Sequence, residues 1–237
     1  MCTVTYVKQG DSICLTSNRD ENRRRKAALS PSWHTIKDKK LLFPQDPEAG
    51  GSWFVVNASG DAAVLLNGAL QKHEPRYPYR KSRGVLLLEM MSKPRPVFFF
   101  RKAKLDGIEP FTIVYVKEAW LWLLQWDGKT RHFSMPDPAV PHIWSSVTLY
   151  TPEVIKWREN LFQQFMLQYP SPSPEALLGF HQTQNDDPDN GFIMSRPSGV
   201  FTQSVTQAVI NPGGCTLHYG DLITNKKTRV STPPGYE

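Results

Sequence analysis

Residues 2–21 read CTVTYVKQGDSICLTSNRDE, and this stretch constrains the fold more than any other. Residues 3–8 are rich in β-branched and aromatic side chains, Gln9-Gly10-Asp11 can form a turn, and residues 12–17 return with similar character. This pattern predicts a β-hairpin. The hairpin would end in the tetrapeptide Asn18-Arg19-Asp20-Glu21. Because the second strand returns toward the start of the chain, we expect this tetrapeptide to lie within reach of Cys2.

The rest of the chain alternates predicted strand groups with predicted helices. Turn residues between short apolar runs indicate strands at 53–57 and 61–67, at 111–117, 119–125 and 130–133, and at 199–210 and 215–219. Apolar residues at helical spacing indicate helices at 84–92, 152–169 and 175–182. The proline-rich stretches 94–96, 136–141 and 170–174 are interpreted as connections inside one domain spanning residues 1–237. Strand groups alternating with helices predict an α+β fold, with helices packed on a two-sheet core.

Composition narrows the class of protein. With 237 residues, 40% of them hydrophobic and 21% charged, the chain is typical of a globular protein. Its net charge of +6 is compatible with anionic ligands or membrane surfaces, but no nucleic-acid-binding motif appears, so no nucleic-acid partner is expected. Three cysteines without paired spacing, no signal peptide and no membrane-spanning run together predict a cytoplasmic protein.

Cys2 is the first candidate catalytic residue. A small residue at position 2 generally permits removal of Met1, which would leave an α-amine with a pKa of about 7.7–8.0 beside a thiol with a pKa of about 8.5. The amine could then act as the base for its own nucleophile. Arg19 could stabilise the thiolate, and Asp20 could bind the α-ammonium or a polar substrate group. Alternatively, the cysteine is incidental, and the charges of the tetrapeptide continue into a solvated run at 23–26.

Several motifs, in order along the chain, resemble those of the NRDE family, whose eukaryotic members are the transport and Golgi organisation 2 proteins. They are Met1-Cys2, residues 18–21, Gly50-Gly51-Ser52-Trp53, Leu65-Leu66-Asn67 and Ser82-Arg83-Gly84. The resemblance implies the four-layer αββα sandwich of N-terminal nucleophile (Ntn) hydrolases, with two antiparallel sheets flanked by helices. Related choloylglycine hydrolases and penicillin acylases cleave linear amides through a thioester.

By this resemblance, Cys2 attacks the substrate, Arg19 and Asp20 line the site, and the Asn67 side chain stabilises the oxyanion. Asn67 can equally be a strand-end residue that forms a turn with Gly68. Two substrate-binding positions depart from the family pattern. Gln203 stands where an arginine is expected, and Ser146 stands where an asparagine is expected.

Three functions therefore remain open. The first is an amidohydrolase that cleaves a linear amide of a small molecule through a Cys2 thioester. The second is a non-catalytic carrier of haem, acyl-CoA or another lipid-like ligand on the same fold, and the third is an interaction scaffold. The six histidines are scattered without metal-binding spacing, so neither a metal nor a cofactor is expected for catalysis.

Overall fold

The structure is a computed structural model that describes residues 3–232. One of its two antiparallel sheets has six strands in the order β10-β1-β2-β11-β12-β13. These strands are β1 (Thr3–Gln9), β2 (Ser12–Asn22), β10 (His142–Ser145), β11 (Val200–Asn211), β12 (Gly214–Asp221) and β13 (Lys227–Ser231). The predicted N-terminal hairpin is formed by β1 and β2, and β2 lies at the centre of the sheet between β1 and β11.

The second sheet has seven strands that follow one another in chain order, from β3 to β9. They are β3 (Leu29–Ile36), β4 (Lys39–Gln45), β5 (Phe54–Asn57), β6 (Ala62–Asn67), β7 (Phe111–Lys117), β8 (Trp120–Trp126) and β9 (Arg131–Ser134). Each strand of this sheet is antiparallel to the strand that follows it in the chain, so the sheet is a meander, and its one long connection within the described residues is 68–110, between β6 and β7.

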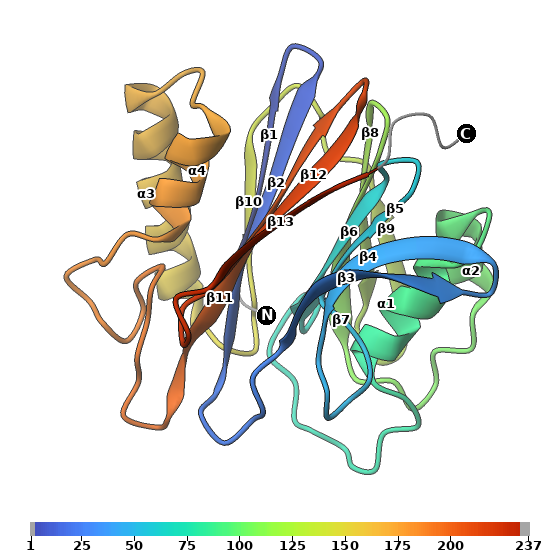
Figure 1. Cartoon of the computed structure of the whole chain (residues 1–237). Coiled ribbons are helices and arrows are strands. Elements are labelled where there is room, and N and C mark those ends of the chain that lie inside the picture. Colours follow the sequence, from blue (N-terminus) through green and yellow to red (C-terminus); the bar gives the residue numbers. More distant parts are fainter. Residues whose placement is uncertain (1–2, 233–237) are drawn as a thin grey trace.

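Within residues 3–232, four helices complete the layers. They are α1 (Arg83–Met91), α2 (Pro96–Lys102), α3 (Pro152–Gln168) and α4 (Pro174–His181). Figure 1 shows α3 and α4 on the outer side of the six-stranded sheet, and α1 and α2 on the outer side of the seven-stranded sheet. The predicted four-layer αββα sandwich is therefore confirmed.

The apolar run of β6 shows how sequence creates the layers. Successive side chains of a strand point to opposite faces of the sheet. Val64 and Leu66 accordingly join the core between the two sheets, whereas Ala63 and Leu65 join the core under α1 and α2. Both faces of the strand are buried, which is why its sequence is continuously apolar rather than alternating.

The predicted hairpins and helices are present with small shifts at their ends. The Thr151 hydroxyl caps α3 by accepting a hydrogen bond from the Val154 N–H, and Pro152 occupies the first turn. The prediction missed β3, β4, β10, β13 and α2; α2 begins inside a stretch that was interpreted as a connection. Within the described residues, no helix is long and apolar enough to cross a membrane.

A buried polar contact joins the six-stranded sheet to α4. Asn18 of β2 donates hydrogen bonds from Nδ2 to the carbonyl oxygens of His181 and Phe192, both at 2.9 Å. The His181 Nδ1 bonds Asn18 Oδ1, and its Nε2 lies 2.7 Å from the Thr5 hydroxyl. The amide oxygen can only accept, so Nδ1 carries a proton, and in the neutral ring Nε2 accepts a hydrogen bond from the Thr5 hydroxyl. Burial, followed by the charge of Arg158, lowers the pKa of His181 to about 3.

This neutral histidine predicts acid sensitivity. The unfolded chain protonates His181 near its ordinary pKa of about 6.5, whereas the folded chain does not, so stability falls as the pH drops below that value. We expect the loss between about pH 7.5 and 5 to be about 2 kcal/mol greater in the unmodified chain than in His181→Gln. Urea unfolding at a series of pH values measures both slopes. Identical slopes would contradict a neutral His181 in the folded protein.

Candidate active site

The tetrapeptide Asn18-Arg19-Asp20-Glu21 lies inside β2 and not in a turn after it. This corrects the sequence interpretation, because β2 continues to Asn22 and remains paired with β11. Strand alternation then separates neighbouring residues of the motif. Arg19 points between the two sheets, where it contacts Trp53. Asn18 points to the opposite face, where it bonds His181.

Three contacts fix the Arg19 guanidinium between the sheets. Its Cζ lies 4.5 Å from the centroid of the Trp53 ring, its Nη2 lies 3.2 Å from Asp46 Oδ2, and its Nη1 bonds Gln203 Oε1. Only 3% of the Arg19 side chain is exposed. A planar guanidinium suits this environment because it can stack on an aromatic ring and donate in its own plane at the same time.

Gln203 reaches Arg19 because of an irregularity in β11. Thr202 pairs with Asp20 and Ser204 pairs with Arg19, so Gln203 is an extra residue in the ladder between these two pairs. Such a bulge redirects a side chain at the point where it occurs. The Gln203 Nε2 also donates to the Asn22 carbonyl oxygen at 3.3 Å, which holds the amide in place.

Asp46, directly after β4, joins two arginines. Its Oδ2 accepts from Arg25 Nε at 2.7 Å as well as contacting Arg19, and its Oδ1 accepts from the backbone N–H groups of Glu48 and Ala49 at 3.0 and 3.1 Å. Burial alone would raise the pKa of Asp46, but the hydrogen bond and charge of Arg25 and the two N–H groups outweigh it and lower the pKa. The carboxylate is therefore ionised at neutral pH.

The basic run at 23–26 is only partly solvated. Arg23, Arg24 and Lys26 are exposed as expected. Arg25 corrects the expectation, because its half-buried guanidinium pairs with Asp46 and lies 3.8 Å from Glu21 Oε2. The partner that buries it comes from the other sheet, so no local pattern marks this residue.

The side of the site opposite Arg19 is formed by the motifs at residues 50–53 and 82–84, whose backbones are in direct contact. Ser52 N–H donates to the Gly84 carbonyl oxygen at 3.3 Å, and Asp46 N–H donates to the Gly51 carbonyl oxygen at 2.9 Å. A Cβ on Gly51 would lie 2.4 Å from the Gly84 carbonyl carbon, and one on Gly84 would lie 2.7 Å from the Ser52 oxygen. Both motifs therefore require glycine for this close approach. Arg83 beside them pairs with Glu109 at 2.9 Å.

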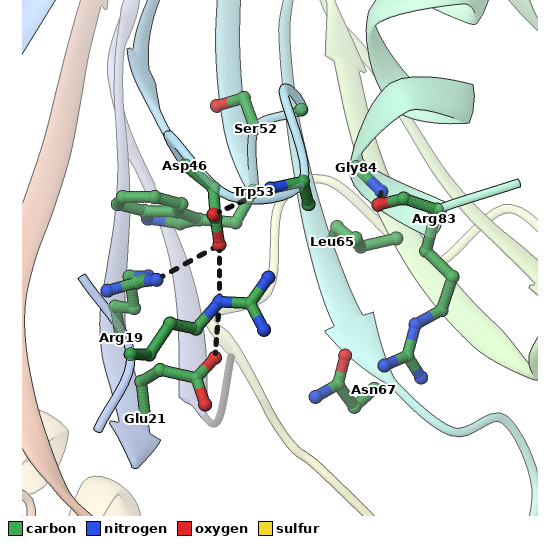
Figure 2. A pocket seen from close by; sticks show the side chains of 13 residues that line it. Arg19, Glu21, Asp46, Ser52, Trp53, Leu65, Asn67, Arg83 and Gly84 are labelled. Atoms are coloured by element: carbon green, nitrogen blue, oxygen red, sulfur yellow. Dashed lines mark hydrogen bonds and ion pairs between the residues drawn. The ribbon is translucent and has the colours of Figure 1, made fainter. Parts of the chain in front are cut away.

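These walls enclose a pocket of about 120 Å³. Figure 2 shows Arg19, Asp46 and Trp53 on one side and Arg83 on the other, with Leu65 and Asn67 between them. Asn67 ends β6, and its backbone oxygen accepts a hydrogen bond from the Ser146 hydroxyl at 2.9 Å. The pocket is polar, and each of its arginines has a carboxylate partner.

The structure brings together only some of the residues expected from sequence. Arg19 and Asn67 line the pocket, while Gln203 and Ser146 contact Arg19 and the Asn67 backbone respectively. Asp20 is not among the lining residues, and its Oδ2 accepts a hydrogen bond from the Tyr150 hydroxyl at 2.7 Å. The expected nucleophile, Cys2, lies outside the described residues.

A sequence profile of the Transport and Golgi organisation 2 family matches residues 1–179. The chain belongs to this family. The resemblance seen in the short motifs is thus confirmed over most of the chain. No curated protein sequence matches this Transport and Golgi organisation 2 family member.

Several solved structures share this fold at low sequence identity. Penicillin V acylase from Agrobacterium tumefaciens is 8% identical with a TM-score of 0.55, over 98% of this chain and 86% of that one. A C2A mutant of conjugated bile acid hydrolase from Clostridium perfringens is 12% identical with a TM-score of 0.54, over 98% and 92%. The Caenorhabditis elegans ortholog of N-acylethanolamine-hydrolyzing acid amidase is 10% identical with a TM-score of 0.53, over 87% and 92%. The family member therefore has an Ntn-hydrolase-like fold.

Sequence reasoning gave no role to Asp46, Arg25, Trp53 or Arg83. One signal was available for Asp46, because Asp46-Pro47-Glu48 has the composition of a turn in which an aspartate accepts from N–H groups two and three residues later. Its ion pairs could not be foreseen, since both arginines come from a distant part of the chain.

The glycine contact at the pocket wall predicts a specific sensitivity. Gly51→Ala should lower the free energy of unfolding by at least about 2 kcal/mol, because the new methyl group meets backbone atoms that cannot rotate away. Gly179→Ala in α4 is the matched control, since nothing lies within 4 Å of its added Cβ, and it should be neutral or stabilising by up to about 1 kcal/mol. Denaturant unfolding of both variants measures the difference, and equal effects would refute the packing argument.

Loss of the Asp46 charge should also destabilise the protein. Asp46→Asn leaves Arg19 and Arg25 facing a neutral group, so we expect a loss of about 3 kcal/mol at neutral pH. Because the pKa of Asp46 is lowered by folding, its contribution is present above the ordinary carboxyl pKa and lost as the pH falls through the folded value. The gap between variant and parent should therefore close toward about pH 3. Glu48→Gln, at an exposed neighbour, serves as the control and should change stability little.

Proposed function

We propose that this family member is an N-terminal-cysteine amidohydrolase that cleaves a linear amide of a small molecule. In this proposal, Met1 is removed and the α-amine of Cys2 accepts the thiol proton. The sulfur attacks the amide carbonyl carbon, and the amine product leaves with that proton as the thioester forms. Water then hydrolyses the thioester, which releases the carboxylic acid and restores the thiol.

The observation that carries the proposal is the convergence of Arg19 and Asn67 on one pocket from two different sheets. Arg19 supplies a fixed positive charge suited to a thiolate or an oxyanion, and the Asn67 amide is an oxyanion donor. Thr3, which follows Cys2 in the sequence, pairs with Asn18 next to Arg19, and Arg158 bonds its hydroxyl. These contacts hold Thr3, the first described residue, beside β2.

Other roles follow from the contacts around this pair. Gln203 restrains Arg19, and Ser146 restrains the backbone of Asn67, so we assign both a contribution to substrate binding that runs through these partners. Asp20 is proposed to bind the α-ammonium of Cys2. The similar structures support an amide substrate, since they include an acylase, a bile acid hydrolase altered at a second-position cysteine, and an acid amidase.

The size of the pocket bears on the rival carrier function. At about 120 Å³ it is smaller than the roughly 300–1,000 Å³ typical of sites that enclose a drug-sized ligand. Its walls carry three arginines and two carboxylates. A pocket of this kind suits the scissile amide better than a whole haem or an acyl chain, so its size favours the hydrolase as the function of this pocket.

The two remaining cysteines make the nucleophile directly testable. Burial, and then the charge of Glu175, raises the pKa of Cys14 to about 12, and burial, with Cys14 beside it, raises the pKa of Cys215 to about 12. Both thiols are therefore protonated and inaccessible near neutral pH. We expect a thiol-directed acyl probe to label the folded protein at one site, Cys2.

Cys2→Ala should abolish this labelling, whereas Cys14→Ala should retain it; intact mass spectrometry counts the labels. The same measurement on the unlabelled protein tests the first step, because a chain that keeps Met1 has no free α-amine at Cys2. Retention of Met1, or equal labelling of Cys2→Ala, would overturn the proposal.

A further inference from the structure

A second notable surface surrounds α2, on the outer side of the seven-stranded sheet. Residues 93–104, which contain α2, carry five basic side chains and no acidic one. The helix has only seven residues and leaves the neighbouring end of β8 uncovered. We define the α2 surface as Lys93, Arg95, Phe98, Arg101, Lys117, Trp120 and Trp122.

Two of the three aromatic members of the α2 surface project from the fold. Phe98 and Trp120 are each 54% exposed. Trp122 lies between them, because it lines a shallow hollow together with Phe98 and its ring centroid is 6.2 Å from that of Trp120. On its other side, Trp122 stacks on the buried Tyr115 at 5.3 Å. The protruding rings are therefore fixed to a rigid sheet.

Basic groups surround these rings. The hollow of about 360 Å³ is lined by Arg95, Arg101 and Lys117, with no acidic side chain among the described residues. It shares Pro94, Pro96 and Lys117 with a second hollow of about 420 Å³, which adds Lys39, Lys40 and Lys93 together with Asp38 and Asp61. Six basic and two acidic side chains line the two hollows, and the exposed Glu118 next to Lys117 reduces the net charge to three positive charges.

Exposed aromatic rings surrounded by basic side chains indicate a particular class of binding partner. An aromatic ring that lines a deep cavity can contact a soluble ligand. An aromatic ring that is exposed to water is stabilised when it transfers into the interfacial region of a lipid bilayer. Basic side chains near that boundary are attracted to anionic headgroups. We propose that the α2 surface is a peripheral docking site for an anionic membrane, with Phe98 and Trp120 inserting between headgroups. This inference does not depend on Cys2.

Vesicle sedimentation tests the docking site with the full-length protein. The protein should sediment with phosphatidylcholine vesicles that contain about 30 mol% phosphatidylserine, and should not sediment with pure phosphatidylcholine vesicles. Binding should weaken in about 0.5 M salt, which screens the headgroup charge. The double variant Phe98→Gln/Trp120→Gln and the double variant Arg95→Gln/Arg101→Gln should each lower the partition coefficient about tenfold or more.

Matched controls come from elsewhere on the fold. Leu167→Gln/Tyr169→Gln removes two exposed apolar side chains at the end of α3, on the opposite outer layer (Figure 1), and should bind like the parent. Lys226→Gln/Lys227→Gln removes two exposed charges at β13 and should also bind like the parent. Thermal unfolding of every variant separates lost binding from lost folding, since the substituted side chains are exposed.

Three outcomes would overturn the docking site. They are equal binding to neutral and anionic vesicles, unchanged binding of both α2 surface variants, and displacement from vesicles by inorganic pyrophosphate at constant ionic strength. The last result would indicate a soluble anion as the ligand of these hollows instead of a membrane.

Discussion

The two-residue side-chain period of β2 is the constraint on which the rest of the structure depends. It sends Arg19 between the sheets and sends Asn18 toward α4. A shift of the pairing by one residue would exchange these faces, placing a guanidinium against the neutral His181 and an amide against Asp46. The buried bonds of Asn18 therefore fix the register that brings Arg19 to the pocket. Along β2, a residue that fixes the fold, Asn18, is therefore followed by a residue that lines the pocket, Arg19.

The pocket in turn depends on contacts between segments that are distant in sequence. Asp46 holds Arg19 of β2 and Arg25 of the loop after it, and the position of Asp46 is fixed by the hydrogen bond from its N–H to the Gly51 carbonyl oxygen. Gly51 then packs against Gly84 at the start of α1. The glycines of the two motifs are thus structural, because they let the chain pass close enough for the charged side chains to meet. Substituting one of them would displace the pocket wall without removing any reactive group.

The sequence predicted those parts of the fold that local chemistry determines. Strands β1, β2, β5 and β6 combine β-branched or apolar runs with turn residues, and α3 carries its own capping threonine. The helix α2 escaped prediction because the proline-rich stretch 94–96 resembles a connection, although proline is well tolerated in the first turn of a helix. Within the site, the motifs indicated Arg19 and Asn67. The partners Asp46 and Arg25 could not be inferred, because burial of an ion pair is decided by tertiary contacts and leaves no periodic trace in the sequence.

The basic side chains around the pocket and those at the outer face of the seven-stranded sheet differ in their partners. Around the pocket, Arg19 and Arg25 share Asp46, and Arg83 is paired with Glu109, so the pocket charges are largely compensated and geometrically fixed. Near the outer face, no ion pair joins Arg95 or Arg101 to an acidic side chain within residues 3–232. Paired charges can orient a reacting group that lies close to them. Charges without an ion-pair partner attract an oppositely charged surface from a distance of about one Debye length. Attraction of an anionic partner over a distance is therefore a property of the α2 surface, whereas the chemistry of the pocket depends on paired charges.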